Sequence, residues 1–225
     1  MDVEISIENL SFVYNKSNQE IFRNINLKFQ TGKLYVIFGP SGSGKTTFLN
    51  IMGGMEYGYT GRILFDNKDI REIDRAEFKR KMVSTVFQNY NLFDSFSALE
   101  NLKIAVSIYG KEQYANSKKL RVLLERLGLS PDKHNRKVSM LSGGEQQRIA
   151  IARSIVSDAP VILADEPTGN LDYYNSEVIK KVLKSMAEKM NRCVIVVTHN
   201  ESFKELADCV LHLDSRNHTL LLQVS

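Results

Sequence analysis

Residues 34–47 read LYVIFGPSGSGKTT, an apolar, strand-like run that leads directly into a glycine-rich loop. The loop, from Gly39 to Thr46, matches the pattern G-x-x-x-x-G-K-[ST], which predicts a phosphate-binding loop between a strand and a helix that begins near Lys45. A flexible glycine turn is the alternative interpretation, although the preceding strand and the following helix make a chance match rarer. The stretch therefore indicates an α/β protein that binds phosphate groups.

The residues of this loop offer several kinds of group to phosphate oxygens. Gly42 and Gly44 allow the backbone to turn its N–H groups inward as a nest. Lys45 is predicted to reach the β and γ phosphates of a nucleotide, and Thr46 to offer its hydroxyl to Mg²⁺. The predicted phosphate-binding residues are Gly39, Pro40, Ser41, Gly42, Ser43, Gly44, Lys45, Thr46 and Thr47.

Three more short apolar runs have the composition of buried strands, and long segments separate them. They are VSTVF (83–87), VILA (161–164) and VIVVT (194–198). This spacing is typical of parallel strands joined by crossover connections. Ligands of open α/β sheets bind beyond the carboxyl ends of the strands, so the residues that follow each run are candidates for a site.

The side chains that follow these three runs suit nucleotide chemistry. Gln88 follows the first run, Asp165 and Glu166 follow the second, and His199 follows the third. We expect them to lie with the glycine-rich loop at one edge of the sheet. One carboxylate can hold Mg²⁺ while its neighbour orients an attacking water, and their mutual repulsion raises the pKa of one of them. Taken alone, the acidic pair is better explained as the start of a turn before Pro167.

Two further kinds of structure are predicted outside these runs. Residues 3–14 and 22–30 alternate apolar and polar positions, as antiparallel strands do. Residues 89–156 carry helical patterns and no strand run, which indicates a helical subdomain inserted into the sheet domain. The elements expected after residue 198 are one helix and two strands, at 201–207, 210–213 and 220–224.

A second candidate anion site lies at residues 141–148, LSGGEQQR. Ser142 and Glu145 form the pattern of a capping box, so an ordinary helix start is the simplest interpretation. That interpretation does not explain the two glycines, Gly143 and Gly144, in the first turn of the helix. Positions without side chains allow an anion to approach the bare N–H groups, and the Ser142 hydroxyl can bind a phosphate oxygen.

Composition limits the classes of function. The chain has 225 residues, 43% of them hydrophobic, with 30 basic and 26 acidic residues and a net charge of +4. That charge is too small to predict nucleic-acid binding. No secretory signal is visible and no window reaches the ~18 apolar residues of a membrane span. Cys193 and Cys209 lie in apolar runs and are expected to be buried thiols in a reducing compartment, so we expect a cytosolic protein.

Five motifs occur in a fixed order along the chain: GPSGSGKTT, VFQNYNLF, LSGGEQQR, VILADEPTGNLD and VVTHN. In these motifs, which span nearly the whole chain, the sequence resembles the nucleotide-binding subunit of an ABC transporter. The resemblance implies a P-loop NTPase with a RecA-like core (1–88 and 158–225), an N-terminal antiparallel β subdomain and an inserted helical subdomain (89–157). It also implies two subunits packed head to tail, with each ATP between the P-loop of one and the LSGGE of the other.

The resemblance implies a role for each motif residue. Thr46 and Gln88 approach Mg²⁺, and Asp165 is the carboxylate of the second Walker motif. Glu166 is the general base, and His199 is the switch histidine at the γ-phosphate. These are roles that the resemblance implies, and the sequence alone does not fix the distances between the residues.

Further roles are implied for residues outside these strand ends. Lys45 holds the phosphates, and Ser142, Gly143 and Gly144 bind the nucleotide of the opposing subunit. Asp172, in GNLD, lies in a loop that crosses the dimer interface. Tyr14 matches the aromatic residue that stacks on adenine, although Phe12 lies close by in the chain and a strand tyrosine usually packs in the core.

The segment after Gln88 corresponds in the family to the region that meets the coupling helix of the membrane subunit. This segment leaves apolar side chains, Phe93 and Phe96 among them, in an expected loop. Packing beneath the helical subdomain is the alternative explanation for these two residues. A membrane permease is therefore an expected partner, with the chain peripheral on the inner face of the membrane.

Details of three motifs are similar to one branch of the family. NIMGGME, the paired glutamines of LSGGEQQR and ADEPTGNLD are similar to the lipoprotein-release and macrolide-export branch, which includes peptide-antibiotic exporters. Met140 and Asn200 depart from the residues that are frequent at their positions, which are glutamine and aspartate. An ABC importer subunit shares every catalytic motif and is the alternative. A soluble ABC protein acting on ribosomes would normally carry two cassettes in one chain.

Overall fold

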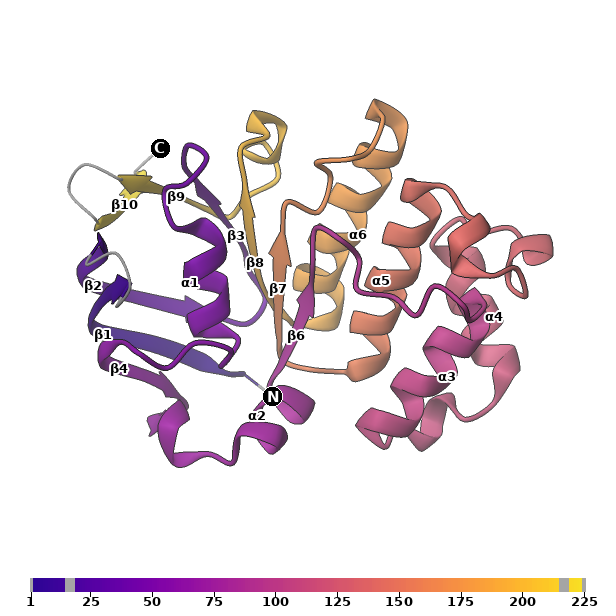
Figure 1. Ribbon diagram of the computed structural model, residues 1–225, viewed down its shortest axis with the longest axis horizontal. Coiled ribbons are helices and arrows are strands. Elements are labelled where there is room, and N and C mark those ends of the chain that lie inside the picture. The colour runs from indigo at the N-terminus through magenta and orange to yellow at the C-terminus, as the bar shows by residue number, and fades with distance from the viewer. Residues whose placement is uncertain (1, 15–18, 215–218, 224–225) are drawn as a thin grey trace.

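The computed structural model describes residues 2–14, 19–214 and 219–223, which form two β-sheets with helices between and beside them (Figure 1). The first sheet is antiparallel. Its order is β2-β1-β4-β5, with β1 (Glu4–Tyr14), β2 (Gln19–Gln30), β4 (Thr60–Phe65) and β5 (Lys68–Asp69). Ile5, Ile7 and Leu10 of β1 are buried, and the alternation changes phase at Asn9 because the register shifts there and its φ is 52°.

The second sheet has six strands in the order β10-β9-β3-β8-β7-β6. Its strands are β3 (Leu34–Phe38), β6 (Val83–Val86), β7 (Val161–Asp165), β8 (Cys193–Thr198), β9 (Cys209–Asp214) and β10 (Thr219–Gln223). The ladders from β9 through β6 are parallel, and β10 pairs antiparallel with β9. The four apolar runs are therefore parallel neighbours, as expected, and their carboxyl ends share one edge.

The helices of the described chain are α1 (Lys45–Met52), α2 (Arg75–Lys81), α3 (Ala98–Tyr109), α4 (Ser117–Arg126), α5 (Gly143–Ser157) and α6 (Tyr173–Met190). Figure 1 shows α3, α4 and α5 together at one end of the molecule and the antiparallel strands at the other. The mixed α/β class and the inserted helices agree with the expectation. The exact division at residues 88–89 and 157–158 stays a prediction.

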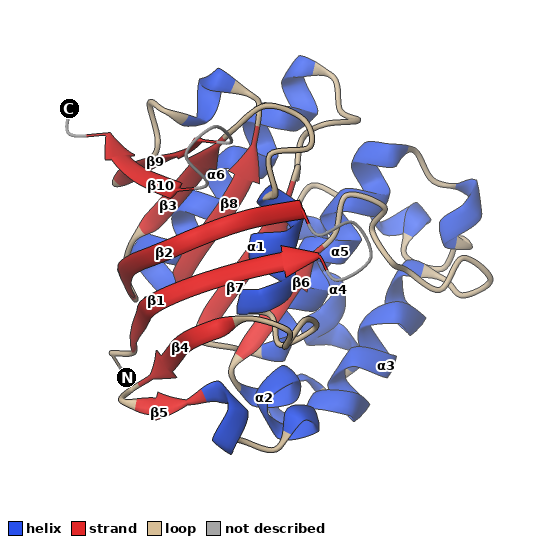
Figure 2. Ribbon diagram, turned by 60° about the vertical axis from the view of Figure 1, so that its left-hand side comes forward, coloured by secondary structure: helices blue, strands red, loops and turns tan. Residues whose placement is uncertain are grey.

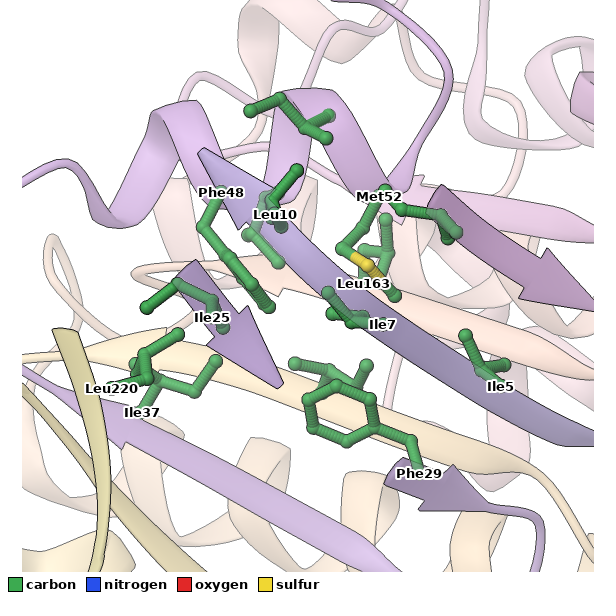
Figure 3. Packing of buried hydrophobic residues seen from close by; sticks show 14 of the residues in the cluster. Ile5, Ile7, Leu10, Ile25, Phe29, Ile37, Phe48, Met52, Leu163 and Leu220 are labelled. Atoms are coloured by element: carbon green, nitrogen blue, oxygen red, sulfur yellow. The ribbon is translucent and has the colours of Figure 1, made fainter. Parts of the chain in front are cut away.

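The two faces of the parallel sheet belong to two hydrophobic cores. Tyr35 and Ile37 of β3 share a core with the antiparallel sheet and α1, whereas Leu34, Val36 and Phe38 share a core with α3, α4, α5 and α6. Figure 2 shows α1 between the two sheets, and Figure 3 shows its side chains among those of both sheets. Burial of both faces explains why β3 is apolar at every position. Because β3 is buried on both faces, the position of the loop that follows it is also fixed.

One expected helix and one expected buried cysteine differ in the structure. The helix expected at 201–207 is only a 3₁₀ turn, Glu201–Phe203, because the buried Phe203 anchors it and the chain must return to start β9 at Cys209. Val224, expected to end the last strand, lies outside the described residues. Both cysteines are free, Cys193 buried as expected but Cys209 only half-buried. Among the described residues, no helix is both long and apolar enough to cross a bilayer.

Candidate functional site

A cavity of about 430 Å³ lies at the carboxyl edge of the parallel strands. It is formed by the ends of β3, β7 and β8, the loop after β6, and the adjoining ends of β1 and β2. Its lining is Tyr14, Gln19, Ile21, Ser41, Gly42, Gly44, Lys45, Thr46, Thr47, Gln88, Asp165, Glu166 and His199. Of these, all but Gln19 and Ile21 were expected from the sequence. The structure thus brings residues far apart in the chain into one site.

The glycine-rich loop is folded tightly around its own lysine. Lys45 is buried, and its Nζ donates to the carbonyl oxygens of Gly39 at 2.7 Å and Pro40 at 2.9 Å. Gly44 caps α1 with φ 101°, and a Cβ atom there would lie 2.5 Å from Cγ2 of Ile21. Both the left-handed backbone and the lack of space require glycine at this position. The loop therefore aims the N-terminus of α1 at the cavity.

The groups around the loop fit a chain of phosphates. The side chain of Ser43 is buried against Gly39, and its hydroxyl has no hydrogen-bond partner among the described residues. A buried polar group without a partner is rare and calls for a ligand or other explanation. No side chain caps the first turn of α1, so its N–H groups remain available to an anion. Backbone N–H groups, an ammonium and hydroxyls together match the chemistry of phosphate oxygens.

Asp165 and the loop are joined by a hydrogen bond. Thr46 Oγ1 donates to Asp165 Oδ2 at 2.8 Å, although 119 residues separate them in the chain. Burial raises the pKa of the Asp165 carboxyl, the charge of Glu166 raises it further, and Thr46 and Lys45 act in the opposite direction. The raised pKa expected for one member of the acidic pair thus falls on Asp165. The mutual repulsion that we expected is the smaller of the two effects that raise it.

Asp165→Asn is expected to stabilise the nucleotide-free protein. An aspartate whose folded pKa is raised disfavours folding at any pH where it is charged, so the neutral amide should raise Tm at pH 7, on the order of 2 °C. The amide oxygen can still accept from Thr46. The gain in Tm should shrink as the pH falls toward 4. Near that pH, close to the ordinary aspartate pKa of 3.8, the carboxyl becomes protonated in both the folded and the unfolded protein. Scanning calorimetry checks this, and a lower Tm for the variant would contradict it; Asp94→Asn, at an exposed position, is the control.

Glu166 is held in an unusual backbone conformation at the end of β7. Its φ is 44°, a left-handed value that is uncommon for a non-glycine residue and is associated with functional sites. Its carboxylate accepts from the hydroxyl of Thr198 at 2.9 Å and from the backbone N–H of His199 at 3.1 Å. His199 Nδ1 lies 2.8 Å from Glu166 Oε1, and the His199 side chain is 69% exposed. The pair can accept a proton and contact a ligand at the cavity mouth.

Tyr14 and Phe12 have different surroundings. Phe12 is buried, whereas Tyr14 is 41% exposed, lies at the rim of the cavity, and places its hydroxyl 2.7 Å from Thr47 Oγ1. The two rings are edge to face, with centroids 5.0 Å apart. Of the two aromatic residues, Tyr14 is therefore the one with a face available to a ligand at the cavity. Gln19 and Ile21 were missed because β2 begins three residues earlier than the alternation had indicated.

Seven expected site residues do not line this cavity. Gly39, Pro40 and Ser43 belong to the glycine-rich loop itself, whereas Ser142, Gly143, Gly144 and Asp172 belong to other segments. Ser142 caps α5 in a capping box, in which its Oγ accepts from the Glu145 N–H and its N–H donates to Glu145 Oε2 at 2.9 Å. Asp172 caps α6 by accepting from the Asn175 N–H at 2.9 Å. Hydrogen bonds from the Asn175 N–H and amide lower the pKa of Asp172. Within one chain, the four residues of the other segments stand apart from the cavity.

A pair of aromatic side chains is exposed in the loop after β6. Phe93 is 48% exposed and Phe96 is 43% exposed, with their rings edge to face at 5.9 Å. Packing beneath the helical subdomain is therefore wrong for both residues. Phe93 also borders a groove of about 290 Å³ that runs between the β6 region and α3. The pair forms part of an apolar surface outside the cavity.

Comparison with known proteins gives consistent similarities. A family model described as ABC transporter matches residues 22–169. An uncharacterized ABC transporter ATP-binding protein, YclH of Bacillus subtilis (strain 168), is 38% identical over 96% of both chains. The lipoprotein-releasing system ATP-binding protein LolD of Treponema denticola is 36% identical, covering 91% of this chain and 92% of the relative.

Solved structures show the same fold. The dimeric structure of MJ0796, described as a bacterial ABC transporter cassette, has a TM-score of 0.85 and 31% identity, and covers 98% of this chain and 99% of that one. A dimeric post-hydrolysis state of the same cassette, bound to ADP and Pi, has a TM-score of 0.83 and 30% identity over the same shares.

Proposed function

We propose that this chain, which belongs to the ABC transporter family and is an ATP-binding ATPase of that family, works as one of a pair of subunits that power a separate membrane permease. One observation carries the proposal. The cavity gathers the phosphate loop, Asp165, Glu166 and His199, while the LSGGE motif of the same chain lies outside it. A complete site therefore calls for a second chain.

The cavity residues that the motifs supply, together with Tyr14, are assigned roles in ATP binding and hydrolysis. Lys45 and the loop hold the phosphates, and Tyr14 contacts adenine. Glu166 accepts a proton from the attacking water, and His199 contacts the γ-phosphate. The hydrogen bonds from the Thr198 hydroxyl and the His199 N–H to the Glu166 carboxylate support its role as the proton acceptor. They hold the carboxylate in place at the cavity before ATP binds.

A magnesium ion completes the chemistry by neutralising phosphate charge. Thr46, Gln88 and Asp165 would hold it, directly or through water. Among the described residues, no group of three or more His, Cys, Asp or Glu side chains could hold a metal. Phosphate oxygens of ATP and water would supply the remaining ligands of the ion.

Two chains are proposed to pack head to tail around two ATP molecules. Ser142, Gly143 and Gly144 of one chain then contact the ATP bound to the P-loop of the other, and Asp172 lies at the interface. The dimeric state of the MJ0796 cassette supports the pairing of two chains. ATP closes the dimer because each nucleotide binds two surfaces, and loss of the γ-phosphate link reopens it.

The cargo is proposed to be a lipoprotein, peptide or antibiotic that is exported or extruded. The LolD relatives support the lipoprotein-release branch. The permease is proposed to contact the surface around Phe93 and Phe96, where exposed aromatic rings remain uncovered in the chain alone. The chain would then be cytoplasmic and peripheral on the inner face of the cell membrane. An importer subunit is the alternative, since it needs the same catalytic residues.

Co-purification with the permease encoded beside this chain tests the proposal. We expect a permease with four transmembrane helices and a large extracytoplasmic domain, and we expect lipoprotein or peptide to stimulate ATP hydrolysis of the complex in liposomes. Phe93→Asp should reduce recovery of the complex at least about 10-fold, because it places a charge in an apolar interface. Val122→Asp, at an exposed apolar position on α4, is the matched control. A compact permease that works with a solute-binding protein would favour the importer.

A further inference from the structure

A chain of hydrogen bonds joins three segments that flank the LSGGE motif. Arg148 of α5 is buried, and its Nη1 donates to the carbonyl oxygen of Gly128, just after α4, at 2.6 Å. Its Nη2 donates to Asn175 Oδ1, in the first turn of α6, at 2.5 Å. Asn175 Nδ2 donates in turn to Asp172 Oδ2 at 2.6 Å. The end of α4, α5 and the loop before α6 are thus connected through the side chains of Arg148 and Asn175.

The side chain of Asn175 suits this position for a chemical reason. Its oxygen accepts from a cation, Arg148, and its nitrogen donates to an anion, Asp172. Only an amide offers both an acceptor and a donor in this geometry, and only one orientation of the amide satisfies both partners. A carboxylate at position 175 would keep Arg148 but repel Asp172, and an aliphatic side chain would lose both bonds.

Asn175 also packs against the LSGGE motif itself. A Cβ atom on Gly144 would lie 2.9 Å from Asn175 Cγ, so the glycine leaves the space that the amide occupies. A Cβ atom on Gly143 would lie 3.8 Å from the carbonyl oxygen of Asn170, in the loop before α6. Besides allowing an anion to approach, Gly144 therefore allows close contact with Asn175 within its own chain.

We infer that Asn175 is a positioning residue that fixes the LSGGE motif to the Asp172 loop of the same chain, so that the two meet the partner subunit as one unit. The inference rests on the proposed two-chain site. Through Arg148 and the Gly128 carbonyl, the same chain of hydrogen bonds continues to the end of α4. A shift of α4 is thereby carried to both elements that face the partner's ATP.

ATP-driven dimerisation tests the role of Asn175. In a Glu166→Gln background, which keeps ATP bound, Asn175→Ala should weaken dimerisation on the order of 10-fold, since two charge-assisted hydrogen bonds are lost. The affinity of the single chain for ATP should be unchanged, because Asn175 is not in the cavity lining. If Asn175 only stabilised the fold, its loss would lower Tm and would not weaken dimerisation selectively while single-chain ATP affinity stays unchanged. Lys181→Ala, at an exposed position further along α6, is the control.

An exchange of groups makes the test specific. Asn175→Asp alone should weaken dimerisation because two carboxylates then face each other. Adding Asp172→Asn should recover at least half of the lost dimer affinity on a logarithmic scale. The amide at position 172 then donates to the carboxylate at position 175, and that carboxylate still accepts from Arg148. Sedimentation and ATP titration measure both affinities for the two single variants and the pair.

The outcomes separate this inference from the proposed function. If the Glu166→Gln parent does not dimerise with ATP, the two-chain site is wrong. If the parent dimerises and Asn175→Ala dimerises with equal affinity, only the role of Asn175 is wrong. A parallel loss of single-chain ATP affinity in Asn175→Ala, or no recovery in the exchanged pair, would also overturn the role of Asn175.

Discussion

Glu166→Gln is expected to reduce ATP turnover by about 10²–10⁴-fold while ATP binding is retained. A glutamine oxygen in the place of Oε2 can still accept from the Thr198 hydroxyl, which lies 2.9 Å from Oε2, and from the His199 N–H, which lies 3.4 Å from it. The geometry of the cavity is therefore kept, but the group that accepts the proton of the attacking water is lost. Bound ATP then persists, and the closed dimer should accumulate.

Phosphate release at saturating ATP, in the presence of the permease, measures this effect. Sedimentation of the same variant with ATP measures the trapped dimer. Glu205→Gln, an equivalent change at an exposed position far along the chain, should behave as the unchanged protein. Near-normal turnover in Glu166→Gln would show that another group accepts the proton.

Lys45→Ala is expected to weaken ATP binding on the order of 100-fold. The ammonium is buried at the centre of the loop, where it donates to the carbonyl oxygens of Gly39 and Pro40. Two charge-assisted hydrogen bonds to phosphate oxygens account for an effect of this size. The loss should fall on binding itself, which distinguishes this variant from Glu166→Gln.

Equilibrium titration with ATP measures the affinity. Lys33→Ala is the matched control. This exposed lysine precedes the first residue of β3, far from the cavity, and its replacement lowers the net charge by the same amount. Unchanged ATP affinity in Lys45→Ala, with an intact fold, would rule out the assignment of the phosphate loop.

The parallel sheet and most of the cavity could be predicted from local sequence. Each buried strand is an apolar run, and the residue after it, such as Gln88 or His199, reaches the common edge because parallel strands end there. The positions in the cavity follow from topology alone. The catalytic roles assigned to these residues stay predictions until the variants are measured.

Other features could not be read from local patterns because they depend on partners far along the chain. The hydrogen bond between Thr46 and Asp165 joins residues 119 positions apart, and the raised pKa of Asp165 comes chiefly from burial. The left-handed backbone of Glu166 has no sequence signal, since glutamate rarely adopts it. Asn175 lies outside every motif, and its contact with Arg148 appears only when α5 and α6 are brought together.

The strand order also governs how the chain emerges from the ribosome. The neighbours of β3 are β8 and β9, so Phe38 has no sheet partner until Thr198 has been synthesised, roughly 160 residues later. At about 5–20 residues per second, this interval lasts roughly 8–32 s. During this interval, the apolar LYVIF strand is not hydrogen-bonded to either of its two neighbouring strands. We therefore expect chaperones that hold nascent chains to bind it.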